Sequence, residues 1–188
     1  MSIESRFEDS PAYGYIPEGE ELYEGFKMRA EMKREVYDVH YDEGIFVGYR
    51  WYDTKQIDPE FCFGYGLSYT SFEYSDIKIS TKQFSANEAI EVKVSVKNTG
   101  HIDGKETVQI YISDSKSSIP RPLKELKAFE KVFLQSGKSK ELSFQLEPSA
   151  FQYWHPEEKK WIAEPGEFEI LVGASSRDLR LNERVMLK

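Results

Sequence analysis

The chain has 188 residues, which is enough for one domain and an extension. Hydrophobic residues make up 39% of it and aromatic residues 14%, a composition that favours a β-rich protein. The formal net charge is −8, and residues 1–60 hold all of it, with 15 acidic and 7 basic side chains. This acidity, without a basic patch, argues against a nucleic-acid partner.

Compartment and membrane association are constrained by what the sequence lacks. The single cysteine, Cys62, cannot form an internal disulfide. No apolar run approaches the ~20 residues that span a bilayer, and the N-terminal residues show no signal-peptide pattern. We therefore expect a soluble, cytoplasmic protein with no membrane partner, unless the chain is a fragment of a secreted enzyme.

Residues 1–65 are expected to form a mostly irregular N-terminal extension. Proline and glycine recur among aromatic residues in 1–19, which favours an extended loop. Residues 20–37 are rich in Glu, Lys, Arg and Met, and they fit either a short helix or a solvated charged insertion. Gly44–Tyr52 is β-branched and aromatic and is bounded by glycine, so it predicts a short strand.

Residues 61–70, Phe-Cys-Phe-Gly-Tyr-Gly-Leu-Ser-Tyr-Thr, mark the change from irregular to regular structure. Pro59, just before them, biases Asp58 toward an extended conformation. Gly64 and Gly66 allow backbone shapes that other residues disfavour. We expect this aromatic segment to be a junction that packs against another part of the protein.

From residue 67 onward, apolar and polar residues alternate with a period of two, which is typical of strands with one buried face. The clearest case is Ala89–Lys97, and the turn residues Asn98-Thr99-Gly100 close it. The expected strand regions are 72–79, 89–97, 107–112, 126–134, 142–146, 167–174 and 180–187, with 151–154 and 161–163 flanking a polar hairpin.

About seven strands with turns between them predict an all-β fold. The expected architecture is an antiparallel β-sandwich of the immunoglobulin or fibronectin type III kind over residues 66–188. The extension at 1–65 precedes it.

Several short motifs, in this order and spacing, resemble the C-terminal part of glycoside hydrolase family 3 β-glucosidases. Each is weak alone, but together they are specific and cover nearly the whole chain except about residues 18–37. The motifs are Glu8–Tyr13, Tyr41–Asp53, Phe61–Thr70, Val96–Gly100, Arg121–Leu126, Phe129–Val132, Pro165–Phe168 and Val172–Asp178. Cys62 stands where the family's Phe-Pro-Phe-Gly has proline, which loosens the expected turn.

The resemblance implies the third domain of a three-domain enzyme, after a barrel and an α/β sandwich domain. Residues 1–65 would then be the tail of the α/β domain plus a linker, and residues 66–188 the fibronectin type III-like domain. The family's nucleophile lies in the barrel, and no position here matches its motif. No catalytic residue is therefore carried over.

No metal or cofactor is expected. His40, His101 and His155 lack metal-ligand spacing, and no glycine-rich loop precedes a helix. Cys62, among aromatics, is expected to be a small buried side chain rather than a nucleophile.

Two groups of residues are candidates for binding. The first is an interdomain or self-association surface, in which Arg50 is expected to pair with a carboxylate: Ile45, Phe46, Val47, Tyr49, Arg50, Trp51, Tyr52, Phe61, Phe63 and Tyr65. The second, at the hairpin, could stack on a sugar or simply pack: Tyr153, Trp154 and Trp161.

Three functional hypotheses follow. The leading one is a non-catalytic accessory domain whose partners are the catalytic domains of a β-glucosidase, in cis or in trans. The second is a free carbohydrate-binding module that uses the Trp154/Trp161 hairpin, and the third is a self-sufficient glycosidase. If Gly44–Tyr52 lacks its covering domain, its unpaired strand edge would also favour a two-fold homodimer.

Overall fold

The computed structural model describes residues 2–11, 43–114 and 116–188. The helix considered for 20–37 lies outside the described residues, as do residues 1 and 12–19 of the loop expected at 1–19. The regular elements are η1 (Phe7–Asp9), α2 (Tyr49–Lys55), β1 (Phe72–Ile79), β2 (Gln83–Phe84), β3 (Ile90–Asn98), β4 (Gly104–Asp114), β5 (Glu125–Leu134), β6 (Ser139–Leu146), η2 (Pro148–Phe151), β7 (Tyr153–His155), β8 (Lys160–Ile162), β9 (Gly166–Gly173) and β10 (Leu179–Leu187).

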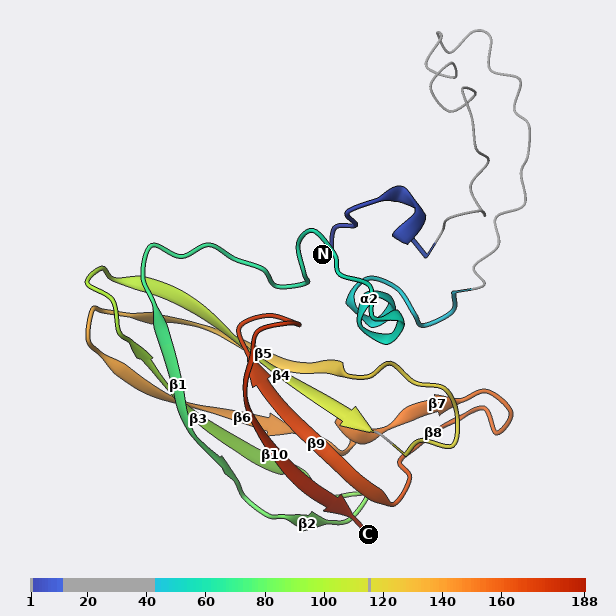
Figure 1. The fold of residues 1–188 in the computed structure, drawn as a ribbon. Helices are drawn as coiled ribbons and strands as arrows, with labels where there is room; N and C mark the ends of the chain where they lie inside the picture. The colour runs from blue at the N-terminus through green and yellow to red at the C-terminus, as the bar shows by residue number, and fades with distance from the viewer. Residues whose placement is uncertain (1, 12–42, 115) are drawn as a thin grey trace, which may run out of the picture.

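Two sheets form the sandwich that the alternation predicts (Figure 1). One sheet has the strand order β1-β3-β6, and the other has the order β2-β10-β9-β4-β5. Strands β7 and β8 pair separately as a hairpin that projects from one end of the sandwich. All pairings are antiparallel except that of β2 with β10, which is parallel.

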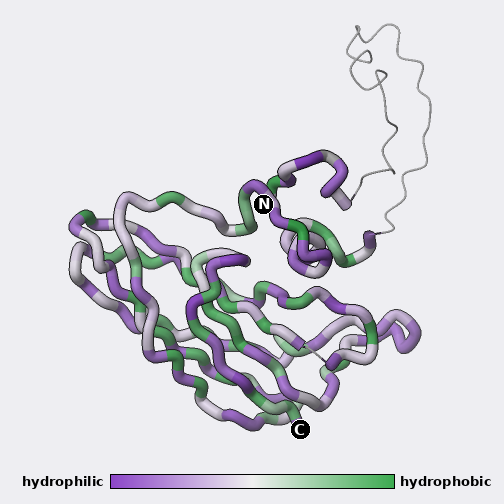
Figure 2. Tube along the Cα trace, viewed as in Figure 1, coloured by the Kyte–Doolittle hydropathy of each residue, from purple (hydrophilic) through white to green (hydrophobic). Residues whose placement is uncertain are grey.

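The core lies between the two sheets, where the apolar positions of each strand meet. In β3, the side chains of Ile90, Val92, Val94 and Val96 are fully buried, while the residues between them reach the surface or its edge. In β9, Phe168, Ile170 and Val172 point inward, as the sequence predicts. The tube in Figure 2 shows the resulting alternation of hydrophobic and hydrophilic residues along the strands.

The strand at 72–79 is predicted exactly, and the other long strands agree to within a few residues. Two details were not foreseen. Strand β2 has only two residues, too short for a periodic pattern, and Phe151 belongs to the turn η2 rather than to a strand.

The strand predicted at Gly44–Tyr52 is wrong. Gly44 and Gly48 both have φ of 56°, which breaks an extended backbone at each end of the apolar run. The residues after Gly48 form helix α2, which ends at Gln56 in the left-handed conformation. In a helix, positions three and four apart share a face, so Tyr49, Tyr52 and Asp53 turn to the same side.

No helix in the described part of the chain is long and apolar enough to cross a membrane.

Replacing Val94 with Asp should unfold the sandwich. Val94 is 0% exposed and lies opposite Leu142 of β6, so the carboxylate would be buried without a partner. The free energy of unfolding should fall by several kcal/mol, which is comparable with the ~5–15 kcal/mol that stabilises a typical domain. Urea unfolding followed by circular dichroism measures it. Lys97→Asp, at an exposed position of the same strand, is the control and should unfold near the wild-type midpoint.

Candidate functional site

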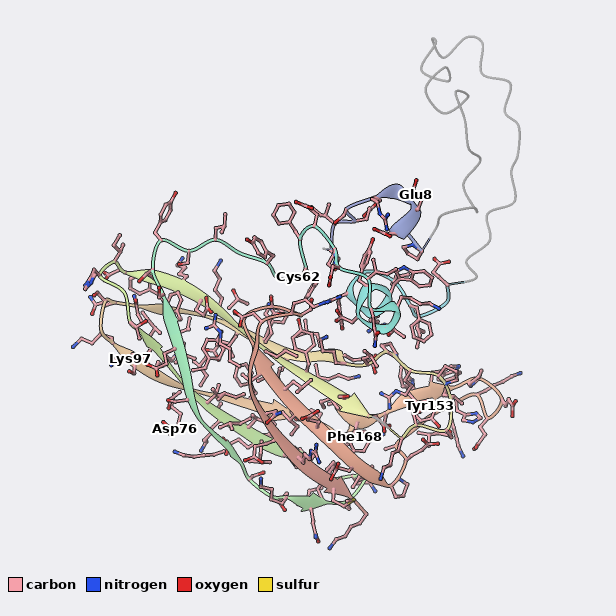
Figure 3. All side chains as sticks on the ribbon, viewed as in Figure 1. Glu8, Cys62, Asp76, Lys97, Tyr153 and Phe168 are labelled. Atoms are coloured by element: carbon pink, nitrogen blue, oxygen red, sulfur yellow. The ribbon has the colours of Figure 1, made fainter. Side chains whose placement is uncertain are left out.

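The candidate site is the junction, which we define as residues 43–66 together with the sandwich residues they contact. Helix α2 lies beside one end of the sandwich, close to the start of β5 and to the loop between β9 and β10 (Figure 1). The linker that follows α2 runs past Cys62 over the same part of the molecule (Figure 3). The extension is therefore attached to the sandwich over this whole stretch.

Asp53 is the central charged group of the junction. Its side chain is only 4% exposed, and one carboxylate oxygen lies 2.5 Å from Nζ of Lys124, in the loop before β5. The other oxygen lies 2.5 Å from Nε of Arg177, in the loop after β9. Arg177 also donates to the carbonyl of Ile57 at 2.8 Å and pairs with the exposed Asp58 at 3.1 Å. One buried carboxylate thus connects α2 to two separate loops.

Tyr49 fixes the first turn of α2 against the outer face of the sheet. Its ring lies 5.2 Å from that of Phe63 and meets the ring of Tyr111 nearly edge-on at 5.8 Å. Its hydroxyl oxygen accepts a hydrogen bond from the backbone N–H of Leu126 at 2.9 Å. Tyr111 in turn donates to Gln109, so the aromatic contact continues into β4.

Glu125, the first residue of β5, is surrounded by three cations. Its carboxylate lies 3.3 Å from Arg50, 2.8 Å from Arg121 and 3.5 Å from Lys127. Burial alone would raise the pKa of Glu125, but Lys127, Arg121 and Arg50 together lower it below its usual value. Burial also lowers the pKa of Lys127. The ion pair predicted for Arg50 is present, and it attaches α2 to β5.

Helix α2 also contacts the first residues of the chain. Trp51 donates its indole N–H to the carbonyl of Asp9 at 3.0 Å. Tyr52 donates its hydroxyl to Glu4 at 3.4 Å, and burial together with the Glu4 carboxylate raises its pKa to about 12. Residues near the N-terminus are therefore held on the junction as well.

The linker after α2 approaches the sheet very closely. A Cβ added at Gly64, where φ is 81°, would come within 2.4 Å of the amide nitrogen of Gln109, so only glycine fits there. The carbonyl of Phe63 accepts from the backbone N–H of Ser176 at 2.9 Å. Cys62 is half-buried, and its thiol donates to the hydroxyl of Ser175 at 3.4 Å.

The ten residues expected at an interdomain surface divide into two groups. Tyr52 is buried, and Phe46, Tyr49, Arg50, Trp51 and Phe63 are partly covered. Ile45, Val47, Phe61 and Tyr65 remain exposed. The sequence reasoning did not single out Leu67 and Tyr69, which are 89% and 95% exposed. Their position in the aromatic segment 61–70 was the sequence feature that could have identified them.

The hairpin residues do not form one flat platform. Tyr153 is buried, and its hydroxyl donates to Glu164 at 2.7 Å. Trp154 and Trp161 are 48% and 62% exposed, but their rings meet edge-on at 5.8 Å with an interplanar angle of 70°. Only the two tryptophans present free surface to a ligand.

Metal chemistry finds no support in this region. Among the described residues, no group of three or more His, Cys, Asp and Glu side chains could hold a metal ion. Asp53 and Glu125, the least exposed carboxylates of the junction, are both held by cations. The geometry fits a structural joint between two parts of a polypeptide.

Asp53→Asn should destabilise the protein by about 3–5 kcal/mol, because breaking the buried ion pair deprives the buried ammonium of Lys124 of this countercharge. Asp58→Asn is a matched control, since Asp58 pairs with the same Arg177 but is 96% exposed. Its cost should stay below ~1 kcal/mol. Urea unfolding of both variants measures the difference, and equal costs would contradict the central role of Asp53.

Glu125→Gln should destabilise the protein in a pH-dependent way. The folded state lowers the pKa of Glu125, so its carboxylate stabilises the fold above the unfolded pKa of ~4.3. That contribution is lost as the pH falls through the folded pKa. The difference between wild type and variant should therefore be large at pH 7 and shrink below about pH 4. Urea unfolding across this range measures it.

Glu130→Gln on the same strand is the control, because its pair with Lys140 is exposed. It should show a small difference at both pH values. A Glu125→Gln cost that does not change with pH would contradict the assignment.

Known proteins resemble this chain over most of its length. Residues 106–176 match the family described as "Fibronectin type III-like domain". The chain is 57% identical over 147 residues to Thermostable beta-glucosidase B of Acetivibrio thermocellus, covering 78% of this chain and 20% of the relative. It is 46% identical over 180 residues to Beta-glucosidase BoGH3A of Bacteroides ovatus, covering 96% and 22%.

A solved structure agrees with these similarities. The GH3 beta-glucosidase of Bifidobacterium adolescentis superposes with a TM-score of 0.85 at 36% identity, covering 100% of this chain and 25% of that one. The chain thus spans about a fifth of the length of the curated relatives it matches. It is a fibronectin type III-like β-sandwich with an N-terminal extension, of the kind found in glycoside hydrolase family 3 β-glucosidases.

Proposed function

We propose that this chain acts as a non-catalytic accessory domain of a β-glucosidase-like enzyme, docking against catalytic domains and fixing their orientation. The proposal rests on how much of each protein the sequence similarity covers. The similarity extends over 96% of this chain but over only 22% of the matched relative. Most of such an enzyme would therefore lie outside the part that this chain represents.

The junction offers a surface for that docking. Its exposed apolar side chains are Ile45, Val47, Phe61 and Tyr65, and the exposed Leu67 and Tyr69 follow directly after it. Exposed apolar patches are typical of interaction sites, and these six exposed side chains all lie within residues 45–69 of the sequence. The buried ion pairs of Asp53 hold the segment firmly on the sandwich, so the surface is presented in one orientation.

Catalysis by this chain alone is not part of the proposal. Glycoside hydrolysis generally needs a facing pair of carboxylates, about 5–5.5 Å apart in retaining enzymes and wider in inverting ones. The buried carboxylates Asp53 and Glu125 are instead neutralised by neighbouring cations. Glu106 accepts a hydrogen bond from Tyr74 at 2.9 Å.

The domain division expected from the sequence is part of this proposal. Residues 66–188 would form the accessory domain, and residues 1–65 would be the tail of the preceding domain and a linker. The contacts of Asp53 and Tyr49 attach the end of that tail to the sandwich. We infer that the two parts move as a unit relative to the catalytic domains.

A carbohydrate-binding module is the second candidate, and the exposed indoles of Trp154 and Trp161 are the observation that favours it. Calorimetric titration with cello-oligosaccharides would support it if binding is lost in Trp154→Ala while the fold stays intact.

The main test replaces the matched region of Thermostable beta-glucosidase B with this chain. The chain alone should not hydrolyse an aryl-β-glucoside, whereas the chimaera should be active. Ile45→Asp/Val47→Asp should shorten the half-life of the chimaera on heating by about tenfold, equivalent to ~1.4 kcal/mol of lost docking energy. Lys97→Glu, on the outer face of the other sheet, is the control.

Two outcomes would contradict the proposal. One is turnover by the isolated chain that stays proportional to protein through purification. The other is an unchanged half-life in the Ile45/Val47 variant. Light scattering of the isolated chain also tests the two-fold dimer, which we retain as a proposal for the uncovered junction. The same double substitution should abolish that dimer.

A further inference from the structure

A groove of about 600 Å³ lies between the linker and the outer face of the five-stranded sheet. The linker side is formed by residues 64–68 and 70–72, and the sheet side by Lys105, Glu106 and Thr107 of β4 with Lys131 of β5. Residues of the β9–β10 loop and Arg180 close one end. A volume of this size is within the range of sites that hold a ligand or a short peptide segment.

Two lysines in the groove have no countercharge among the described residues. Lys131 lies directly opposite Thr107 in the β4–β5 ladder, so Lys105, two residues earlier, is its diagonal neighbour on the same face. Diagonal neighbours of this kind have side chains starting about 7–8 Å apart. Neither lysine forms an ion pair with any residue that the structure describes. Two adjacent ammonium groups favour an anionic partner.

The other charges of the groove are already paired. Arg180 lies 2.6 Å from Asp178 and 3.8 Å from Glu106, and its guanidinium is 4.5 Å from the ring of Tyr74. Burial raises the pKa of Glu106, whose carboxylate also accepts a hydrogen bond from Tyr74. The excess charge of the groove is therefore positive, in a chain whose net charge is −8.

Exposed apolar side chains line the groove or lie next to its lysines. Tyr65 and Leu67 line its linker side. Phe129 and Phe133, which are 68% and 54% exposed, flank Lys131 on the outer face of β5. A free inorganic anion would use the lysines but not these hydrophobic side chains. A polypeptide segment with acidic and apolar residues would use both.

We propose that this groove binds an acidic, apolar segment of the catalytic polypeptide, as a second contact separate from Ile45 and Val47. This inference rests on the proposed accessory function. In a fused chain the segment is tethered, and short flexible linkers give effective concentrations in the millimolar range. An intrinsic dissociation constant near 1 mM is therefore sufficient for occupancy.

The direct test is an NMR titration of the isotope-labelled full chain. The probes are acetyl-Leu-Asp-Phe-Glu-Leu-amide, its neutral counterpart acetyl-Leu-Asn-Phe-Gln-Leu-amide, and inorganic phosphate. The acidic peptide should shift the amide signals around Lys105 and Lys131 with a millimolar dissociation constant. The affinity of the neutral peptide should be at least about tenfold lower, as expected for the loss of charge pairing.

Lys105→Gln/Lys131→Gln should abolish this binding. Lys97→Gln/Lys138→Gln is the matched control, because both lysines are exposed and without an ion pair to the described residues. The proposal is overturned if the acidic peptide does not bind, if the neutral peptide binds equally well, or if phosphate binds as tightly as the acidic peptide.

The chimaera separates this inference from the proposed function. If Ile45→Asp/Val47→Asp shortens its half-life on heating and Lys105→Gln/Lys131→Gln does not, only the groove proposal fails. If Ile45→Asp/Val47→Asp leaves the half-life unchanged, the accessory function fails, whatever the lysine variant shows. Shortening by both supports the two contacts together.

Discussion

The position of the extension depends on the burial of one carboxylate. Asp53 on α2 is almost completely buried, and its two oxygens meet cations from two loops that are far apart in the sequence. Desolvating Asp53 and Lys124 is costly, and only close pairing with good geometry offsets that cost. Such an arrangement is weak as a source of stability but strict about geometry, since any other placement of α2 would leave charges buried and unpaired.

The same interactions explain why the junction can act as a rigid connection. Tyr49 bonds to the backbone of β5, Arg50 pairs with Glu125, and Phe63 accepts a hydrogen bond from the loop after β9. These contacts are of different kinds: aromatic packing, ion pairing and backbone hydrogen bonding. A hinge at this point would have to break all of them together. Forces applied to the extension are therefore transmitted to the sandwich rather than absorbed in a flexible tether.

The sequence predicted the sandwich well because its strands follow a simple rule. From Ile90 to Val96, every second side chain is apolar, and burial of one face follows directly from that period. The junction did not follow a period. Gly44–Tyr52 has the composition of a strand, but the positive φ at its two glycines and the contacts of Tyr49 and Asp53 decide the helix. Such tertiary contacts cannot be read from local propensity. The partners Lys124 and Arg177 were within recognised motifs, but no pattern connected them to Asp53.

The parallel pairing of β2 with β10 has a consequence for the order of folding. Leu187 lies beside Phe84 in this pairing, and both side chains are buried, yet they come from nearly opposite ends of the sandwich sequence. Such a contact closes a long loop, and the chain must lose conformational entropy to close it before the contact stabilises the fold. A two-residue strand cannot hold its place without that partner. This edge should therefore form after the antiparallel pairs β4–β5 and β9–β10. The chain should fold on the slow, millisecond-to-second timescale of proteins dominated by non-local strand pairs.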